Sequence, residues 1–359
     1  MKKITVGILC GGKSAEHEVS LRSARNIAAA LDPKKYNSVF IKIEKSGRWL
    51  PQPSAAFLNA PTLSPQKKSG RSPQSKELVQ IPDRPLLNTI DVIFPVLHGP
   101  NGEDGTIQGL FKVADIPFVG AGVLGSAVGM DKDVMKRLLR EAGIFTSRSV
   151  TLSRHSPISF SRIKKQLGLP LYVKPVNMGS SVGISRVKSE IEFKKAIGLA
   201  FQFDTRVLVE ECIYGREIEC SVLGDEIIGE KVIASLPAEI IADDSFYSYD
   251  EKYSSDSKTT FALPPKNLSK ATIKKIQACA IKTFNALSCA GMGRVDVFLQ
   301  KDGTVVVIEI NTIPGFTEIS MYPKMWEASG IGTPELIDRL ISMAIKRHAA
   351  ETALKTSYI

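Results

Sequence analysis

Short apolar runs alternate with amphipathic segments along the first third of the chain. The segments SLRSARNIAAAL (20–31) and TIQGLFKVAD (106–115) repeat apolar residues at helical spacing. The apolar runs between them are short and rich in β-branched residues, which predicts the strands ITVGILC (4–10), SVFIKIE (38–44) and DVIFPVLH (91–98). Strands that alternate with helices indicate an open, mostly parallel sheet, so we expect an α/β domain over residues 1–125.

A stretch of about residues 51–80 breaks this pattern. It is rich in Pro, Ser and Lys and has no steady periodicity. We expect a surface insertion without a catalytic group.

The remaining chain mixes strands and helices and predicts two α+β units, over residues 126–221 and 222–359. Helices are expected from Asp131, after Ser189, after Ser269 and from Thr333, where a threonine N-cap precedes a proline. The polar segment from about residue 243 to 260 has no steady periodicity, which is typical of a loop that closes over a site.

A hairpin near the end of the chain carries polar groups where valine would fit. The segment GRVDVFLQKDGTVVVIEINTIPG (293–315) predicts two strands, and a two-residue turn at Asp302-Gly303 places Asp296 opposite Glu309. Alternation puts Val307 on the same face as Glu309. Carboxylates that face each other across a ladder are destabilising, so this pair requires a cation between them or solvent around them.

Composition excludes several classes of protein. With 43% hydrophobic and 23% charged residues the chain is an ordinary globular protein, and its apolar runs are shorter than the ~20 residues that cross a bilayer. The net charge of +10 is concentrated partly in residues 67–76, without interleaved aromatic residues, so we expect no nucleic-acid partner. Five cysteines, an odd number, indicate reduced thiols in a cytoplasmic protein.

One motif matches a phosphate-binding loop as a string. Residues 7–14, GILCGGKS, fit the P-loop pattern, but Ile8, Leu9 and Cys10 continue a strand and leave Gly7 inside it. Two other functions remain open at this point. One is a P-loop nucleotide switch or NTPase that uses Lys13, and the other is a basic binding module without catalysis.

Three other segments carry candidate chemistry. In KPVNMGSSVGIS (174–185) a lysine precedes a Gly-Ser loop that suits phosphate oxygens, although an ordinary hairpin loop has the same composition. The segment VLVEECIYGREIE (207–219) carries several carboxylates, which are often only solvated on strands. His98 follows a strand at the sheet edge where α/β proteins collect ligands, or is a plain loop histidine.

The order of these parts is similar to that of ATP-grasp ligases, and the chain resembles the D-alanine-D-alanine ligase family over nearly its whole length, apart from residues 51–80. The resemblance implies an ATP-grasp architecture, in which an N-terminal open α/β domain precedes two α+β subdomains that sandwich ATP. The segments that carry it are AEHEVS (15–20), HGPNGEDGT (98–106), MDK (130–132), KPVNMGSSVGIS (174–185), VEECIYGRE (209–217), YDEKYSSD (249–256), GRVDVF (293–298) and EINTIPGFTEISMYP (309–323).

The resemblance also implies a reaction, in which ATP phosphorylates one D-alanine and the amine of a second D-alanine displaces the phosphate, for peptidoglycan precursor synthesis. It implies two Mg²⁺ ions, or Mn²⁺, held by Asp296, Glu309 and Asn311, a ligand set of oxygen atoms that suits these metals. The residues that it assigns to ATP are Lys132, Lys174 and Lys252 for the phosphates, Glu210, Glu211 and Ile213 for adenine, and Glu217 for ribose.

The substrate residues follow from the same resemblance. Arg294 and the N–H group of Gly315 correspond to the oxyanion site, and Ser320 with Met321 corresponds to the pocket for the second carboxylate. The residues assigned to the first substrate and the lid are Glu18, His98, Ser180 and Tyr253, of which Tyr253, like Met321, agrees with the D-alanine type rather than the D-lactate or D-serine type. The family further implies a cytoplasmic homodimer with small-molecule substrates and no membrane partner.

Overall fold

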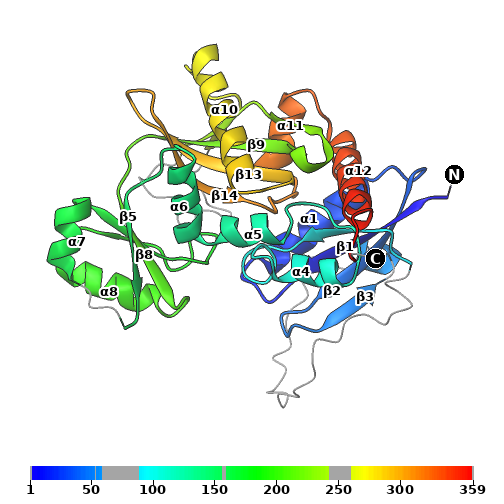
Figure 1. The fold of residues 1–359 in the computed structure, drawn as a ribbon, viewed down its shortest axis with the longest axis horizontal. Helices are drawn as coiled ribbons and strands as arrows, with labels where there is room; N and C mark the ends of the chain where they lie inside the picture. The colour runs from blue at the N-terminus through cyan, green and yellow to red at the C-terminus, as the bar shows by residue number, and fades with distance from the viewer. Residues whose placement is uncertain (1, 53, 59–88, 156–158, 242–259, 358–359) are drawn as a thin grey trace.

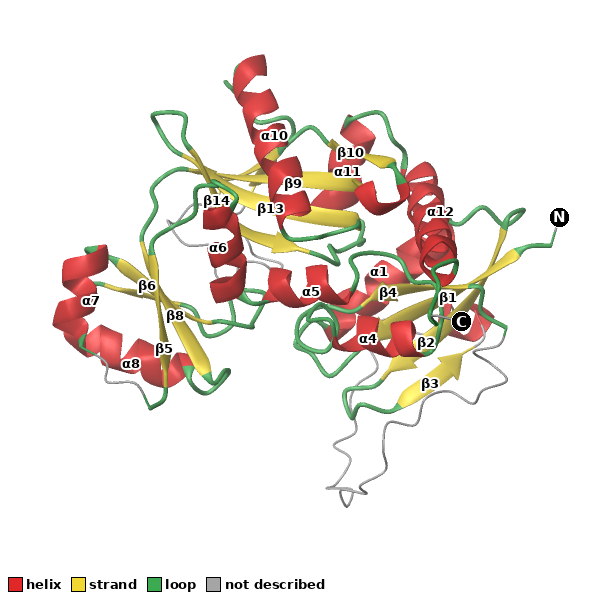
Figure 2. Cartoon of the chain, viewed as in Figure 1, coloured by secondary structure: helices red, strands yellow, loops and turns green. Residues whose placement is uncertain are grey.

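The structure, a computed structural model, describes residues 2–52, 54–58, 89–155, 159–241 and 260–357 (Figure 1). The strands of this part of the chain form three sheets. Helix α5 (Val123–Met130) lies between the N-terminal and third sheets, and α6 (Lys132–Glu141) lies between the second and third sheets (Figure 2).

The first sheet confirms the mostly parallel arrangement expected for the N-terminal part. β1 pairs in parallel with both β2 and β4, and β3 adds an antiparallel edge. The strand order is β3 (Trp49–Gln52), β2 (Tyr36–Ile43), β1 (Ile4–Gly11) and β4 (Val92–Val96). Helices α1, α2 and α4 of the same region span His17–Ala30, Ser54–Leu58 and Thr106–Val113.

The predicted insertion at residues 51–80 is wrong at its start. β3 continues to Gln52, and Phe57 on α2 is only 2% exposed. Its ring stacks on that of Phe40 with 4.0 Å between the centroids. Residues 59–88 lie outside the described part of the chain.

The second sheet is antiparallel, and α7 (Phe160–Leu167) and α8 (Glu190–Ala200) pack against it. The hydroxyl of Ser189 accepts the N–H of Glu192, which confirms the predicted helix start. The strand order is β5 (Ser149–Ser153), β8 (Arg206–Glu211), β6 (Leu171–Pro175) and β7 (Ser185–Val187).

The third sheet is larger and is covered by α10 (Lys270–Ala286), which Ser269 caps. Residues 221 and 222 lie inside β9, so the boundary expected there divides a strand of this sheet. The strand order is β12 (Thr260–Ala262), β11 (Ala238–Ile241), β9 (Arg216–Asp225), β13 (Gly291–Leu299) and β14 (Val305–Asn311). Strand β10 (Glu230–Ala234) also pairs with β9, and the short 3₁₀ helix η1 (Glu226–Ile228) joins the two.

The hairpin of β13 and β14 confirms that Asp296 lies opposite Glu309, but its turn differs from the prediction. The N–H of Gln300 bonds the carbonyl of Thr304, so the loop has three residues, with Gly303 at φ +80°. A bulge after Asp296 restores the expected register. The bulge also turns Val307 into the apolar core, so the prediction that it shares a face with Glu309 is wrong.

The C-terminal helices complete the core of the N-terminal domain. Helix α12 (Thr333–Thr352) follows α11 (Met321–Ala328), and its buried Leu336 and Leu340 belong to the same apolar cluster as Val6 and Phe94. Figure 1 shows α12 beside the N-terminal strands. Two ends of the chain therefore form one hydrophobic core.

The predicted threonine cap of α12 is wrong. Thr333 is already helical, Gly332 is the N-cap, and the Thr333 hydroxyl donates instead to Glu327 over 2.9 Å. The proline keeps its place in the first turn, where its missing N–H has no helical partner to lose.

No helix within the described ranges is long and apolar enough to cross a membrane. All five cysteines carry free thiols, as expected, and Cys10, Cys220 and Cys289 are buried.

Candidate active site

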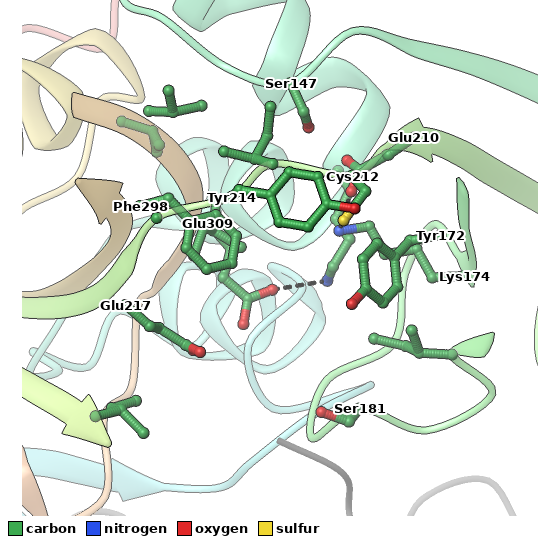
Figure 3. Close-up of a pocket in the computed structure, with 18 of the residues that line it drawn as sticks. Ser147, Tyr172, Lys174, Ser181, Glu210, Cys212, Tyr214, Glu217, Phe298 and Glu309 are labelled. Atoms are coloured by element: carbon green, nitrogen blue, oxygen red, sulfur yellow. Dashed lines mark ion pairs between the residues drawn. The ribbon is translucent and has the colours of Figure 1, made fainter. Parts of the chain in front are cut away.

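A pocket of about 420 Å³ opens between the second and third sheets. This volume is in the range of small-molecule sites. In Figure 3, Glu217 and Glu309 lie on one side of the pocket and Tyr172 and Lys174 on the other. Apolar side chains such as that of Phe298 line much of the wall, so the pocket has an apolar slot and a charged end.

The charged end contains a buried group of three charges. The carboxylate of Glu210 contacts Lys174 Nζ at 2.6 Å and Lys136 Nζ at 2.7 Å. Although burial favours the neutral acid, the two ammonium groups lower the pKa of Glu210 to about 2. Lys174 is therefore fixed at the pocket wall by an ionised partner.

Lys132 links the loop after β6 to the third sheet. Its Nζ donates to the carbonyl of Met178 over 2.8 Å and lies 3.3 Å from Glu309 Oε2. Lys132 is only 5% exposed, although it lines the pocket. Its charge thus faces the same space as Lys174.

The Gly-Ser loop between β6 and β7 takes an uncommon backbone conformation. Ser180 and Ser181 have φ of +51° and +59°, and Gly183 has φ of +72°. Non-glycine residues with positive φ are strained and cluster at ligand sites. Gly179, Ser180 and Ser181 line the pocket, so this loop borders the charged end.

The connection from β8 to β9 forms another wall, to which Cys212, Ile213 and Tyr214 contribute. The carboxylate of Glu211 is held by Arg148, whose Nε donates to it over 2.7 Å. The Arg148 main-chain N–H also donates to Glu211 over 2.7 Å. The Glu211 side chain therefore anchors β8 to the residues just before β5.

Asp296 and Arg294 form a paired unit on β13 next to the pocket. Arg294 Nε and Nη2 each donate to Asp296 over 2.8 Å, and Asn311 Nδ2 donates to the same carboxylate over 3.0 Å. Burial alone lowers the pKa of Arg294, but the carboxylates of Asp296 and Glu219 raise it well above its usual range.

Glu219 is a site residue that the sequence reasoning missed. It pairs with Asp296 across β9 and β13, and Asp296 pairs with Glu309, so three carboxylates form one row across three strands. Glu219 Oε1 lies 3.4 Å from Arg294 Nη2, and the residue is 5% exposed. An acidic residue inside the apolar run IECSVL was the signal that could have identified it.

A second polar group lies where the third sheet meets the N-terminal domain. His98 Nδ1 is 3.1 Å from the carbonyl of Ile313, and burial lowers the pKa of His98. Glu103, which the sequence reasoning did not single out, accepts the N–H groups of Gly99 and Ile313 over 2.8 and 3.2 Å. Burial raises the pKa of Glu103 to about 8.

The loop from Asn311 to Ser320 rests on helix α1. The Phe316 N–H donates to Ser23 over 3.1 Å, and Asn26 donates to the Phe316 carbonyl over 3.0 Å. Gly315 lies so close to Ser320 that an added Cβ would be 2.9 Å from the serine Oγ, so a larger residue here would displace that hydroxyl. The loop thus joins the third sheet to the N-terminal domain.

The other predicted substrate residues lie around this junction. Glu18 on α1 is paired with Lys45 at 3.5 Å. The hydroxyl of Ser320 accepts the N–H of Thr317 over 2.9 Å, and Met321 packs against Ala238 and Met325. Lys252 and Tyr253, with nearly all of the predicted lid, lie outside the described residues.

The P-loop interpretation finds no support in the local geometry. β1 runs through to Gly11, so Gly7 is inside a strand, where an added Cβ would meet Ile90 at 2.9 Å. Lys13 is exposed and does not line the pocket.

The donor chemistry at β13 and β14 fits a hard divalent cation. The side chains of Asp296, Glu309 and Asn311 offer carboxylate and amide oxygens, the ligands that Mg²⁺ and Mn²⁺ prefer. Within the described ranges no cluster of three or more His, Cys, Asp or Glu is arranged to hold a metal. Arg294 and Lys132 instead lie beside these carboxylates.

Two family models match the chain. The D-ala D-ala ligase N-terminus matches residues 5–121, and the D-ala D-ala ligase C-terminus matches residues 138–342. The D-alanine--D-alanine ligase A of Salmonella typhimurium is 47% identical over 99% of this chain and 100% of its own length.

Solved structures agree with this match. The D-alanine-D-alanine ligase of Coxiella burnetii superposes with a TM-score of 0.82 at 38% identity, over 98% of this chain and 97% of that one. The VanG D-Ala:D-Ser ligase of Enterococcus faecalis gives 0.81 at 36%, over 96% and 100%. The Bacillus anthracis D-alanine--D-alanine ligase complexed with ATP gives 0.74 at 27%, over 97% and 99%.

The three-sheet architecture, the pocket between two of the sheets and these full-length matches lead to one conclusion: the chain belongs to the D-alanine-D-alanine ligase family of ATP-grasp enzymes.

Proposed function

We propose that this chain joins two D-alanine molecules into D-alanyl-D-alanine with ATP as co-substrate, for peptidoglycan precursor synthesis in the cytoplasm. One observation carries the proposal: the pocket sets two lysines, Lys132 and Lys174, opposite Glu309 at the end of an apolar slot. A nucleotide needs an apolar surface for its base and positive charge for its phosphates, and this pocket offers both.

ATP lies with its base in the slot beside Ile213 and Phe298 and its ribose near Glu217. Its phosphates extend toward Lys132 and Lys174, under the loop that contains Ser180. The family pattern adds Lys252 to the phosphate contacts. Glu210 acts through Lys174, which it orients, and the Glu210–Ile213 backbone borders the base.

Asp296, Glu309 and Asn311 would hold two Mg²⁺ or Mn²⁺ ions. When bound, such ions neutralise the charge of the transferred phosphoryl group and orient it. Because Lys132 and Arg294 already lie beside these ligands, the chain's own cations share that task at the phosphate end.

The reaction has two steps. A carboxylate oxygen of the first D-alanine attacks the γ-phosphorus, a P–O bond forms, the bond between the γ-phosphorus and the bridging oxygen breaks, and ADP leaves. The neutral amine of the second D-alanine then attacks the acyl carbon, a C–N bond forms, the C–O bond breaks, and the amine proton passes to the departing phosphate. Arg294 and the Gly315 N–H stabilise the oxyanion between attack and release.

The substrates occupy the junction between the third sheet and the N-terminal domain. Glu18 binds the ammonium group of the first D-alanine, with His98 beside it, while Ser320 and the backbone at Met321 receive the carboxylate of the second. The family pattern assigns Ser180 and Tyr253 the role of tying a closed lid to Glu18, which would keep water from the acyl phosphate. We further propose a homodimer, as the family pattern implies.

D-serine as the second substrate is the alternative, because a D-Ala:D-Ser ligase aligns with 96% of this chain. The test is ADP release and product identification by mass spectrometry with D-alanine alone and with D-alanine plus D-serine or D-lactate. D-alanyl-D-alanine as the dominant product supports the proposal. A mixed product from equal concentrations, or ATP hydrolysis without any dipeptide, overturns it.

A further inference from the structure

Lys136 has no place in the mechanism described so far, although it is buried beside the pocket. It lies on α6, is only 1% exposed, and is absent from the pocket lining. Its Nζ contacts Glu210, whose other oxygen contacts Lys174. A buried lysine costs free energy unless its surroundings favour the charged form, so the burial of Lys136 needs an explanation.

The contacts of Lys136 match an ammonium group. Four acceptor atoms lie near its Nζ: Ser147 Oγ at 2.7 Å, Thr146 Oγ1 at 2.8 Å, the Ser147 carbonyl at 3.5 Å, and Glu210 Oε1, which forms an ion pair at 2.7 Å. An ammonium group has three N–H donors and no acceptor, which suits surroundings made of acceptor atoms alone. Burial lowers the pKa of Lys136, but the adjacent Glu210 carboxylate opposes that shift and favours the cation.

The net charge of the group formed by Lys136, Glu210 and Lys174 depends on Lys136. Without Lys136, the ionised Glu210 would cancel the charge of Lys174, the residue that reaches the pocket. With Lys136, the three side chains together carry one positive charge in a region of low dielectric constant, where charge acts strongly.

We propose that Lys136 is a positioning residue that offsets the charge of Glu210, so that Glu210 orients Lys174 without removing its attraction for the nucleotide phosphates. The inference rests on the proposed function, since it takes the pocket to hold ATP. Lys136 acts through Glu210 and Lys174 and does not itself contact the ligand.

The test measures displacement of a fluorescent ADP analogue by ATP and by adenosine, which lacks phosphates. Lys136→Met should weaken ATP binding about 10- to 30-fold, the effect of one unit charge several ångströms from the phosphates. Adenosine binding should change by less than about twofold, since the effect is electrostatic. Arg137→Met removes a charge from the exposed side of the same helix and should leave both affinities unchanged.

A rescue experiment separates charge from packing. Lys136→Met combined with Glu210→Gln leaves Lys174 as the single charge of the group and should recover most of the lost ATP affinity. If Lys136→Met does not fold, as judged by circular dichroism, Lys136→Gln replaces it with a side chain that can still bond Ser147 and Thr146. Equal loss of ATP and adenosine binding, unchanged ATP binding, or no recovery in the double variant overturns the inference.

These measurements are independent of the ligase reaction. If wild-type protein binds ATP with the predicted dependence on Lys136 but forms no dipeptide, the proposed function fails and the inference stands. If dipeptide forms but the affinity for ATP is the same in wild type and Lys136→Met, only the inference about Lys136 fails.

Discussion

The carboxylates of Asp296 and Glu309 face each other across β13 and β14, and each has a basic side chain beside it. Arg294 donates twice to Asp296 at 2.8 Å, and Lys132 lies 3.3 Å from Glu309. The repulsion expected between facing carboxylates is therefore offset by the protein's own cations even without a metal. A divalent cation bound here would add positive charge to carboxylates that already have basic partners.

Glu309→Gln should preserve the fold and lower ligase turnover by roughly 100-fold or more, because it removes charge at the phosphoryl group and not bulk from the core. The unfolding free energy without metal should change by less than about 1 kcal/mol, since the lost repulsion and the lost ion pair oppose each other. Turnover at saturating Mg²⁺ and urea unfolding check both points. Near-normal turnover contradicts the metal assignment. The control is Glu230→Gln, at an exposed carboxylate of the same sheet.

Glu219→Gln tests the row of three carboxylates. We expect kcat to fall roughly 10- to 100-fold, as for residues that orient the groups around a metal, because Arg294 loses one of its two carboxylate partners. The KM for ATP should change little, since Glu219 does not line the nucleotide pocket. Steady-state kinetics of the variant measure both constants. A change in the KM for ATP with an unchanged kcat would show that Glu219 does not act through Arg294.

Glu210 should make stability depend on acid pH. Its pKa falls from 4.5 to about 2 in the folded protein, so its contribution is complete above about pH 4.5 and is lost as pH drops toward 2. By linkage this amounts to about 3 kcal/mol. Urea unfolding of wild type and Glu210→Gln at several pH values measures the difference, which should shrink between pH 4.5 and 2. A difference that is constant with pH contradicts the low pKa.

Lys13→Ala and Lys174→Ala separate the two candidate phosphate sites. Lys13 is exposed outside the pocket, whereas Lys174 is 6% exposed and lines it. Lys174→Ala should weaken ATP binding at least about tenfold, and Lys13→Ala should not affect it. Isothermal titration with a non-hydrolysable ATP analogue gives both affinities. The reverse order would restore the P-loop interpretation.

Local signals in the sequence predict much of the fold. Ser189 and Ser269 cap the helices that were expected after them, and the strand pattern of residues 4–10 excludes a P-loop around Gly7. The hairpin predicts the pairing of Asp296 with Glu309, but by a simpler route than the structure takes. The loop has one residue more than the predicted turn, and the bulge adds one residue to β14, so the two departures cancel and the pairing is kept. Local patterns cannot predict such a compensation, because it depends on packing.

Long-range contacts account for what the sequence does not predict. Lys136 sits in a helix with several basic residues, where a lysine usually faces solvent, and only the folded chain brings it to Glu210. Helix α12 packs on the N-terminal sheet more than 200 residues away in sequence, a contact that no periodicity encodes. The candidate site thus follows from motifs, while the residues that support it require the structure.

The proposed reaction requires that the first D-alanine is activated as an acyl phosphate in this pocket. The most direct measurement uses D-alanine labelled with ¹⁸O in both carboxylate oxygens and follows the inorganic phosphate by mass spectrometry. We expect one ¹⁸O atom in each phosphate released with D-alanyl-D-alanine, because the C–O bond breaks when the amine attacks. Phosphate without ¹⁸O, formed alongside dipeptide, would contradict it.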